Sequence, residues 1–132
     1  DHPAIPGWSY LLTGWAGAES NFLGGAELAI DFLDAANAWI GGAALDLNGA
    51  GLQVPNGQPF HYKEYAVSAI APARAVSVRA RVSLLDPMPN PVGGGQAFVV
   101  DDFTLTAIPE PTTLLLGALG LAGLAGHARR RR

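Results

Sequence analysis

The chain has 132 residues, a length that suits one domain, and it contains no cysteine, which excludes disulfide bonds and thiol chemistry. Residues 1–111 hold all eleven acidic residues and four of the eight basic ones, a net charge of −7, and the other four basic residues are Arg129 to Arg132. So acidic a body repels polyanions, and we expect no nucleic-acid partner.

Residues 1–25 contain Pro, Gly and aromatic residues without a helical period, and they predict a loop with one short strand near Trp8 to Leu11. Residues 26–35 alternate, with Leu28, Ile30 and Phe32 on one side and Glu27, Ala29 and Asp31 on the other. This period of two predicts a half-buried strand. Residues 38–49 then predict two short strands around Gly41-Gly42.

The second half of the body continues with alternating loops and strands. Residues 49–59 predict a loop, and residues 60–72 a strand of mixed phase. The clearest strand is residues 74–85, in which we expect an inward set (Val76, Val78, Ala80, Val82, Leu84) and an outward set (Ser77, Arg79, Arg81, Ser83). Residues 86–95 predict a long turn-rich connection, and residues 96–108 the last strand.

No segment before Pro109 shows the i, i+3, i+4, i+7 apolar pattern of an amphipathic helix. About seven short strands separated by Gly, Pro and Asn turns instead favour an all-β fold class. We therefore expect residues 1–107 to form one domain, an antiparallel β-sandwich.

Residues 108–132 have a different organisation. A Pro-Glu-Pro turn precedes 17 uncharged residues, Thr112 to Ala128, and the arginine cluster closes the chain. As a helix this segment measures about 25 Å, at the short end of what crosses a hydrocarbon core of about 30 Å. We expect one C-terminal transmembrane helix, with the arginines on the cytoplasmic side and the body outside.

This order of parts resembles the PEP-CTERM sorting signal of bacteria, which an exosortase recognises and processes. The resemblance implies that Pro109, Glu110 and Pro111 are the recognition motif, that residues 112–128 are a transient span, and that Arg129, Arg130, Arg131 and Arg132 are the stop-transfer cluster. It also implies an inner-membrane precursor that ends at the cell surface or in the extracellular matrix. A permanent single-pass membrane anchor remains the alternative.

The body has a resemblance of its own. Over about residues 26–107, the stretches APARAVSVRARV, AFVVDDFTLT and FLDA are similar to strands of galactose-binding-like jelly rolls in carbohydrate-binding modules. This similarity implies a jelly-roll-like sandwich and an extracellular polysaccharide as partner. Such domains open with an Asn-x-x-Phe-Glu strand that does not occur here, so we expect a jelly roll lacking its first strand.

Two candidate sites follow in the body. The resemblance implies that Asp101 and Asp102, on the last strand, help to bind a structural Ca²⁺; alternatively, one faces solvent and the other caps the preceding loop. The second site is an aromatic platform for sugar rings, for which we select Tyr62 and Tyr65. The alternative is that most of the body's aromatic residues are core: Trp8, Tyr10, Trp15, Trp39, Phe60, Tyr62 and Tyr65.

Catalytic motifs find little support. Residues 7–11 lack the second Gly of a nucleophile elbow, and His2, His61 and His127 have no metal-ligand spacing. Arg79 and Arg81 share a face, but in an acidic body we expect them to pair with carboxylates. The sequence therefore predicts an exported binding or structural module and not an enzyme.

Overall fold

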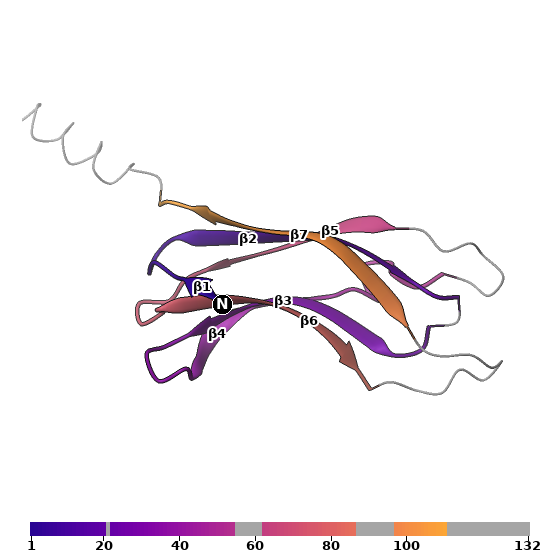
Figure 1. Cartoon of the computed structure of the whole chain (residues 1–132), viewed down its shortest axis with the longest axis horizontal. Coiled ribbons are helices and arrows are strands. Elements are labelled where there is room, and N and C mark those ends of the chain that lie inside the picture. Colours follow the sequence, from indigo (N-terminus) through magenta and orange to yellow (C-terminus); the bar gives the residue numbers. More distant parts are fainter. Residues whose placement is uncertain (21, 55–61, 87–96, 111–132) are drawn as a thin grey trace, which may run out of the picture.

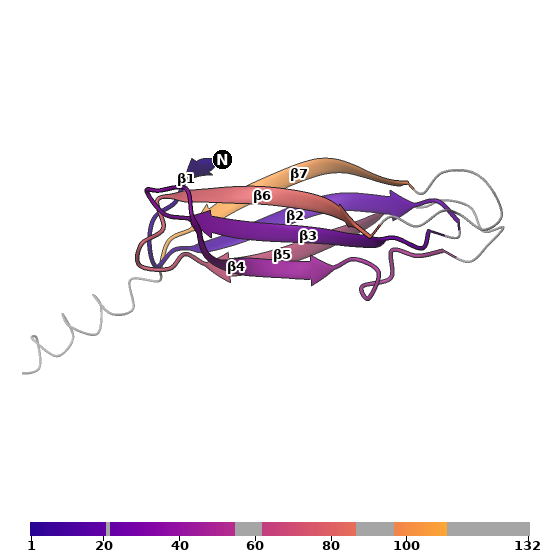
Figure 2. The same ribbon diagram turned by 90° about the horizontal axis from the view of Figure 1, so that it is seen from below.

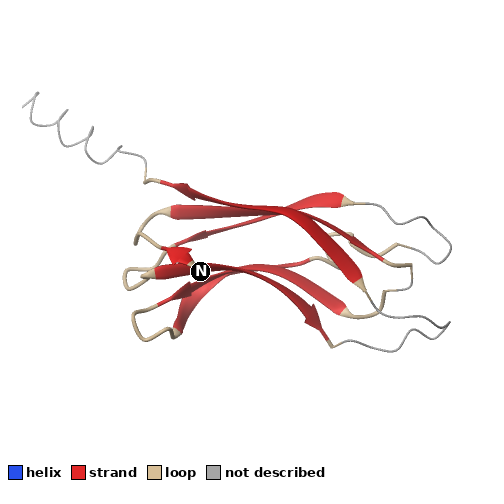
Figure 3. Ribbon diagram, viewed as in Figure 1, coloured by secondary structure: helices blue, strands red, loops and turns tan. Residues whose placement is uncertain are grey.

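The computed structural model describes residues 1–20, 22–54, 62–86 and 97–110. In these residues it contains strands and no helix (Figure 3), which confirms the all-β class. The strands are β1 (His2–Pro3), β2 (Ser9–Ala18), β3 (Gly25–Leu33), β4 (Trp39–Asp46), β5 (Lys63–Ile70), β6 (Ser77–Leu85) and β7 (Phe98–Ile108).

The strands form two sheets that face each other as two layers (Figure 1). The four-stranded sheet has the order β1-β6-β3-β4 and the three-stranded sheet the order β5-β2-β7, and every neighbouring pair is antiparallel. Seen from below, β6 and β7 lie toward one side and β4 and β5 toward the other (Figure 2). The predicted antiparallel sandwich is confirmed, and the arrangement is loosely compatible with the jelly-roll resemblance.

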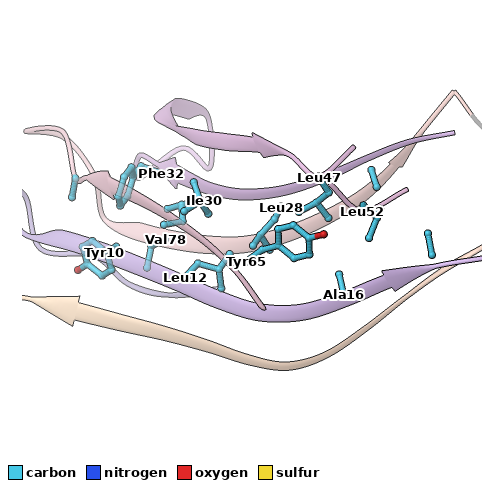
Figure 4. Close-up of a cluster of buried hydrophobic side chains, with 14 of the residues drawn as sticks. Tyr10, Leu12, Ala16, Leu28, Ile30, Phe32, Leu47, Leu52, Tyr65 and Val78 are labelled. Atoms are coloured by element: carbon cyan, nitrogen blue, oxygen red, sulfur yellow. The ribbon is translucent and has the colours of Figure 1, made fainter. Parts of the chain in front are cut away.

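The core fills the space between the two layers (Figure 4). Alternate side chains of each strand point inward, so that Tyr10 and Leu12 of β2 meet Ile30 and Phe32 of β3. The rings of Tyr10 and Phe32 meet edge to face, with centroids 5.5 Å apart. The fully buried large residues are Phe22, Phe32, Leu12, Leu28, Ile30, Leu47 and Val78.

Strand β3 has the predicted alternation of faces, but it is more buried than the expected half-buried strand. Leu28, Ile30 and Phe32 are buried as expected, and on the opposite face Ala29 and Asp31 are buried as well. Arg81 lies directly opposite Ala29 on β6, and its guanidinium bonds to carboxylates on both sides of this alanine. A charged side chain thus covers the outer face of this sheet.

The prediction of a loop and one short strand near Trp8 to Leu11 is wrong in extent. The strand runs over ten residues, from Ser9 to Ala18, and is the centre of the three-stranded sheet. Its second half is rich in Gly and Ala, residues of low strand propensity, which hid the strand from the sequence pattern. The tertiary structure explains Gly14, because a Cβ there would overlap the ring of Phe103.

The prediction of two short strands around Gly41-Gly42 is also wrong. One strand, β4, continues through both glycines and pairs with β3 along its length. Gly42 has a φ of 153°, and a Cβ on it would overlap the carbonyl oxygen of Ile30. These glycines permit a close approach of two strands, and they do not mark a turn.

The expected inward set of residues 74–85 is only partly inward. Val78 is fully buried and Val82 is half-buried, but Val76, Ala80 and Leu84 are exposed. Val76 precedes strand β6, which lies beside the two-residue edge strand β1 and near the border of the sandwich. The opposite sheet therefore covers the inner face of β6 incompletely.

The remaining predictions concern the connections and the tail. The strands expected at residues 60–72 and 96–108 correspond to β5 and β7. The predicted transmembrane helix at residues 112–128, Pro111 and the arginine cluster lie outside the described residues. Within the described part of the chain, no helix is long and apolar enough to cross a membrane.

Candidate functional site

The predicted sorting motif follows the last strand without a linker. Ile108, the final residue of β7, still pairs with Ser9 of β2, and Pro109 and Glu110 come directly after it. Proline has no N–H group to donate to a neighbouring strand, so pairing ends at this point. The motif therefore begins at one end of the folded sandwich, and both Pro109 and Glu110 are exposed there.

The body contacts the glutamate of this motif. Gly7 has a φ of 83°, and a Cβ built on it would overlap Oε1 of Glu110. The N–H of Gly7 donates to the carbonyl of Ala71 at 2.9 Å, which fixes the turn before β2. Any side chain at position 7 would both strain the backbone and displace the carboxylate. The carboxylate of Glu110 thus lies over Gly7, a residue without a side chain.

Asp101 and Asp102 lie at an irregularity in β7. Thr13 pairs with Thr104, and Trp15 with Asp101, so that two residues of β7 stand opposite Gly14 alone. Asp102 has a φ of 51°, and its N–H donates to Oδ1 of Asp101 at 2.9 Å. This geometry is that of a β-bulge that turns one side chain out of the regular alternation.

The two aspartates do not by themselves fit a calcium ion. Both are exposed, one oxygen already accepts a backbone N–H, and Ca²⁺ takes about six to eight oxygen ligands. Among the described residues, no group of three or more acidic, histidine or cysteine side chains gathers here or elsewhere. A calcium site at Asp101 and Asp102 stays a prediction that requires further ligands.

The structure separates the predicted aromatic pair. Tyr65 is 5% exposed and lies in the core, whereas Tyr62 is 42% exposed. Tyr62 precedes β5 and is exposed while Tyr65 is buried, so the two rings do not form a common platform for a sugar ring. Burial raises the pKa of the Tyr65 hydroxyl, which finds no hydrogen-bond partner among the described residues. Tyr62 alone stays a candidate for ligand binding.

A different aromatic residue, Trp15, is exposed on the outer face of the three-stranded sheet, which we call the open face. Trp15, in the middle strand of the three-stranded sheet, is 40% exposed. Its direct neighbours are Glu64 on β5 and Asp101 on β7, both exposed. Directly opposite residues project from the same face, so the indole stands between two carboxylates. The spacing Gly14-Trp15-Ala16 was the available signal, since only the large residue of the three points outward.

The outer face of the other sheet is arranged differently. Arg81 bonds through Nε to Asp31 at 2.7 Å and through Nη1 to Glu27 at 2.7 Å, and Arg79 holds both carboxylate oxygens of Asp1. The hydrogen bond to Asp31 raises the pKa of Arg81 further above its usual value. The expected pairing of Arg79 and Arg81 with carboxylates is confirmed.

Near the sorting motif, the outer face of the three-stranded sheet has a shallow depression of about 580 Å³. Leu11, Ile70 and Ile108 supply its apolar lining, and Ser9 and Ser68 contribute polar groups. Because Ile108 is the residue before Pro109, this depression adjoins the start of the motif.

Comparison with known proteins bears on the tail. No curated protein matches the chain. Residues 107–132 match the family model of the PEP-CTERM protein-sorting motif, and the matched segment starts with Ala107 and Ile108, the last two residues of β7. The chain therefore carries a PEP-CTERM sorting motif that is continuous with the last strand of its sandwich.

Proposed function

We propose that this chain is an exported bacterial protein that an exosortase releases from the inner membrane to the cell surface or extracellular matrix. The match of residues 107–132 is the observation on which this proposal rests, because the motif implies sorting of an extracellular or surface protein. The precursor is membrane-associated before processing. The sandwich domain within residues 1–107 then belongs to the released protein.

The length and charge of the tail support a precursor whose body lies outside the cytoplasm. Seventeen residues would measure about 25 Å as a helix, which is short for permanent residence in a core of about 30 Å, and glycine has a low helix propensity. Four arginines directly after the span favour the cytoplasmic side for that flank. The −7 body then lies outside the cytoplasm.

The junction supports processing at the end of the sandwich. Pro109 and Glu110 are exposed directly after β7, so a membrane enzyme reaches them only by approaching that end of the folded body. The proline on each side of Glu110 keeps the segment extended, which presents the peptide bonds to an enzyme.

The test is the intact mass of the native protein in its own host, with and without the exosortase gene. We expect a mature form without its C-terminal tail in the first case and a full-length membrane form in the second. Glu110→Gln should reproduce the second result, and Glu19→Gln, an exposed carboxylate outside the motif, should not. A mass that is identical in both hosts would overturn the proposal in favour of a permanent single-pass anchor.

For the body we propose a binding module and not an enzyme. Exposed aromatic side chains on the described surface support this role: Trp15, Trp39, Tyr62 and Phe103. Flat rings suit the apolar faces of sugars, in line with the resemblance to carbohydrate-binding modules. Polysaccharide pull-down with the full chain tests this role, and binding that survives substitution of all four residues would contradict it.

A further inference from the structure

We propose that the outer face of the three-stranded sheet around Trp15 binds a cationic amino-sugar polymer, a polysaccharide with free amino groups. This inference rests on the proposed role of the body as a binding module. The chemistry of one row of side chains supports this ligand class. Glu64, Trp15 and Asp101 combine an apolar ring plane with two negative charges.

The row is built by the strand register. Trp15 lies on the central strand, and its neighbours on both sides are directly opposite it. Side chains in such positions have Cβ atoms about 4.5–5.5 Å apart. A single sugar ring stacked on the indole thus has its substituents within reach of a carboxylate on either side.

The two carboxylates have no cationic partner in the described part of the chain. Neither Glu64 nor Asp101 makes an ion pair there, although Asp101 accepts the N–H of Asp102. Arg79 and Arg81 belong to the other sheet, and Lys63 donates to the carbonyl of Ala50 at 2.7 Å. The negative charge beside Trp15 is therefore available to a ligand.

The remaining cation of the body is also remote from this row. Arg74 lies in the turn after β5, whereas Glu64 lies near the beginning of that strand. The six residues from Glu64 to Ile70 span about 20 Å at ~3.4 Å per residue, beyond the screening length of about 8–10 Å. Arg74 therefore does not neutralise the site.

These features select the class of polysaccharide. The C–H face of a pyranose packs on the indole, and an ammonium group makes charge-assisted hydrogen bonds with carboxylates. An ammonium close to the ring face is attracted by the indole as well. A body of net charge −7 repels uronic-acid and other anionic polymers, and an acetylated sugar lacks the charge that the site complements. A polymer with free amines satisfies all three groups.

The experiment compares hexamers that differ in charge, bound to the full chain in a polyoxyethylene detergent that has no sugar headgroup. The probes are a glucosamine hexamer, an N-acetylglucosamine hexamer and a galacturonic acid hexamer, with a lysine hexapeptide as a cation without sugar rings. We expect the glucosamine hexamer to bind at least about tenfold more tightly than the others, because one charge-assisted hydrogen bond contributes at least about this factor.

Variants locate the site. Trp15→Ala should weaken binding of the glucosamine hexamer by about tenfold or more, and Trp15→Phe, which keeps a ring, by less. Glu64→Gln with Asp101→Asn should bring its affinity down to that of the acetylated hexamer. The matched control is Trp39→Ala, because Trp39 is 65% exposed but lies on β4 of the other sheet.

Each of these results would overturn the inference: no binding of the glucosamine hexamer, equal binding of the acetylated hexamer with no effect of the two carboxylate variants, or equal binding of the lysine peptide that Trp15→Ala leaves unchanged. The second result indicates a neutral glycan and the third a general attraction for cations. If the polymers bind only elsewhere on the body, the binding-module role survives and the Trp15 site does not. Exosortase-dependent processing is measured by mass in the host and is independent of all three results.

Discussion

Both outer faces of the sandwich carry carboxylates, but among the described residues only one face pairs them with arginines. On the four-stranded sheet, Arg81 joins Asp31 and Glu27, and Arg79 joins Asp1, so that the charges are matched within the fold. On the three-stranded sheet, Glu64 and Asp101 flank Trp15 without a described cation. The paired charges of the first face contribute to stability, whereas the carboxylates beside Trp15 are without a described cation, which is the basis for proposing a binding site there.

The largest effect should come from Arg81→Met on the matched face. Removal of the guanidinium leaves Asp31, which is only 9% exposed, and Glu27 without a partner. Breaking a fully buried pair costs about 3–5 kcal/mol, and the 37% exposure of Arg81 lowers this figure. We expect the free energy of unfolding of the full chain in urea to fall by about 2 kcal/mol.

The matched control for Arg81 is Arg79→Met. Its ion pair with Asp1 has side chains 40% and 39% exposed, so its removal should cost about 0.5 kcal/mol or less. Equal losses of unfolding free energy for the two variants would contradict the view that the ion pairs of Arg81 stabilise this face more than the pair of Arg79 does.

The second prediction concerns the inner face of the three-stranded sheet. Tyr65 follows Glu64 on β5 but points into the core, where its hydroxyl has no described partner. Tyr65→Phe should leave the free energy of unfolding unchanged or raise it by up to about 1 kcal/mol. Glu64→Phe, which faces outward, is the control and should not stabilise the fold.

Because of Tyr65, the free energy of unfolding should also depend on pH. Burial raises its pKa in the folded state above the usual value of 10.0, so the unfolded chain loses this proton first as pH rises. The stability should be constant with respect to this group below that value and fall above it. The Tyr65→Phe chain should fall less steeply in urea unfolding between pH 9 and pH 11, and parallel curves would contradict the assignment.

The third prediction tests the bulge beside Trp15. Asp102 has a left-handed φ of 51°, which glycine adopts without steric cost, so Asp102→Gly should raise the unfolding free energy by about 0.5 kcal/mol. Asp101→Gly, at the first regular pair beside the bulge, should lower it by about 1 kcal/mol, because a glycine there gains only conformational freedom in the unfolded chain. The same sign for both variants would show that the bulge is not strained.

The smallest effect on stability is expected for the charges of the open face. Glu64→Gln and Asp101→Asn should each change the unfolding free energy by less than about 0.5 kcal/mol, because exposed carboxylates without a cationic partner contribute little and the asparagine side chain at position 101 keeps an oxygen that can accept the N–H of Asp102. A loss as large as that of Arg81→Met would show that these carboxylates are structural, and the contrast between the two faces would disappear.

Much of the architecture could be predicted from the sequence. The alternation of β3 and the apolar content of β7 identified strands because the side-chain period of a strand is local. The same local reading failed at β2 and β4, where glycines are needed for close contacts with Phe103 and Ile30, residues that lie far away or on another strand. The phase of Tyr62 and Tyr65 could have excluded their pairing, since residues three apart on a strand diverge.

The sequence by itself determined the all-β class and the sorting motif, because strand alternation and an ordered tail of proline, glutamate, apolar residues and arginines are written in consecutive residues. Only the tertiary structure decided which charges are matched. Arg81 reaches Asp31 over a separation of 50 residues, and Trp15 stands between Glu64 and Asp101, because strand order and register bring them together. Strand order and register depend on the packing of the whole sandwich, so no local sequence pattern determines them.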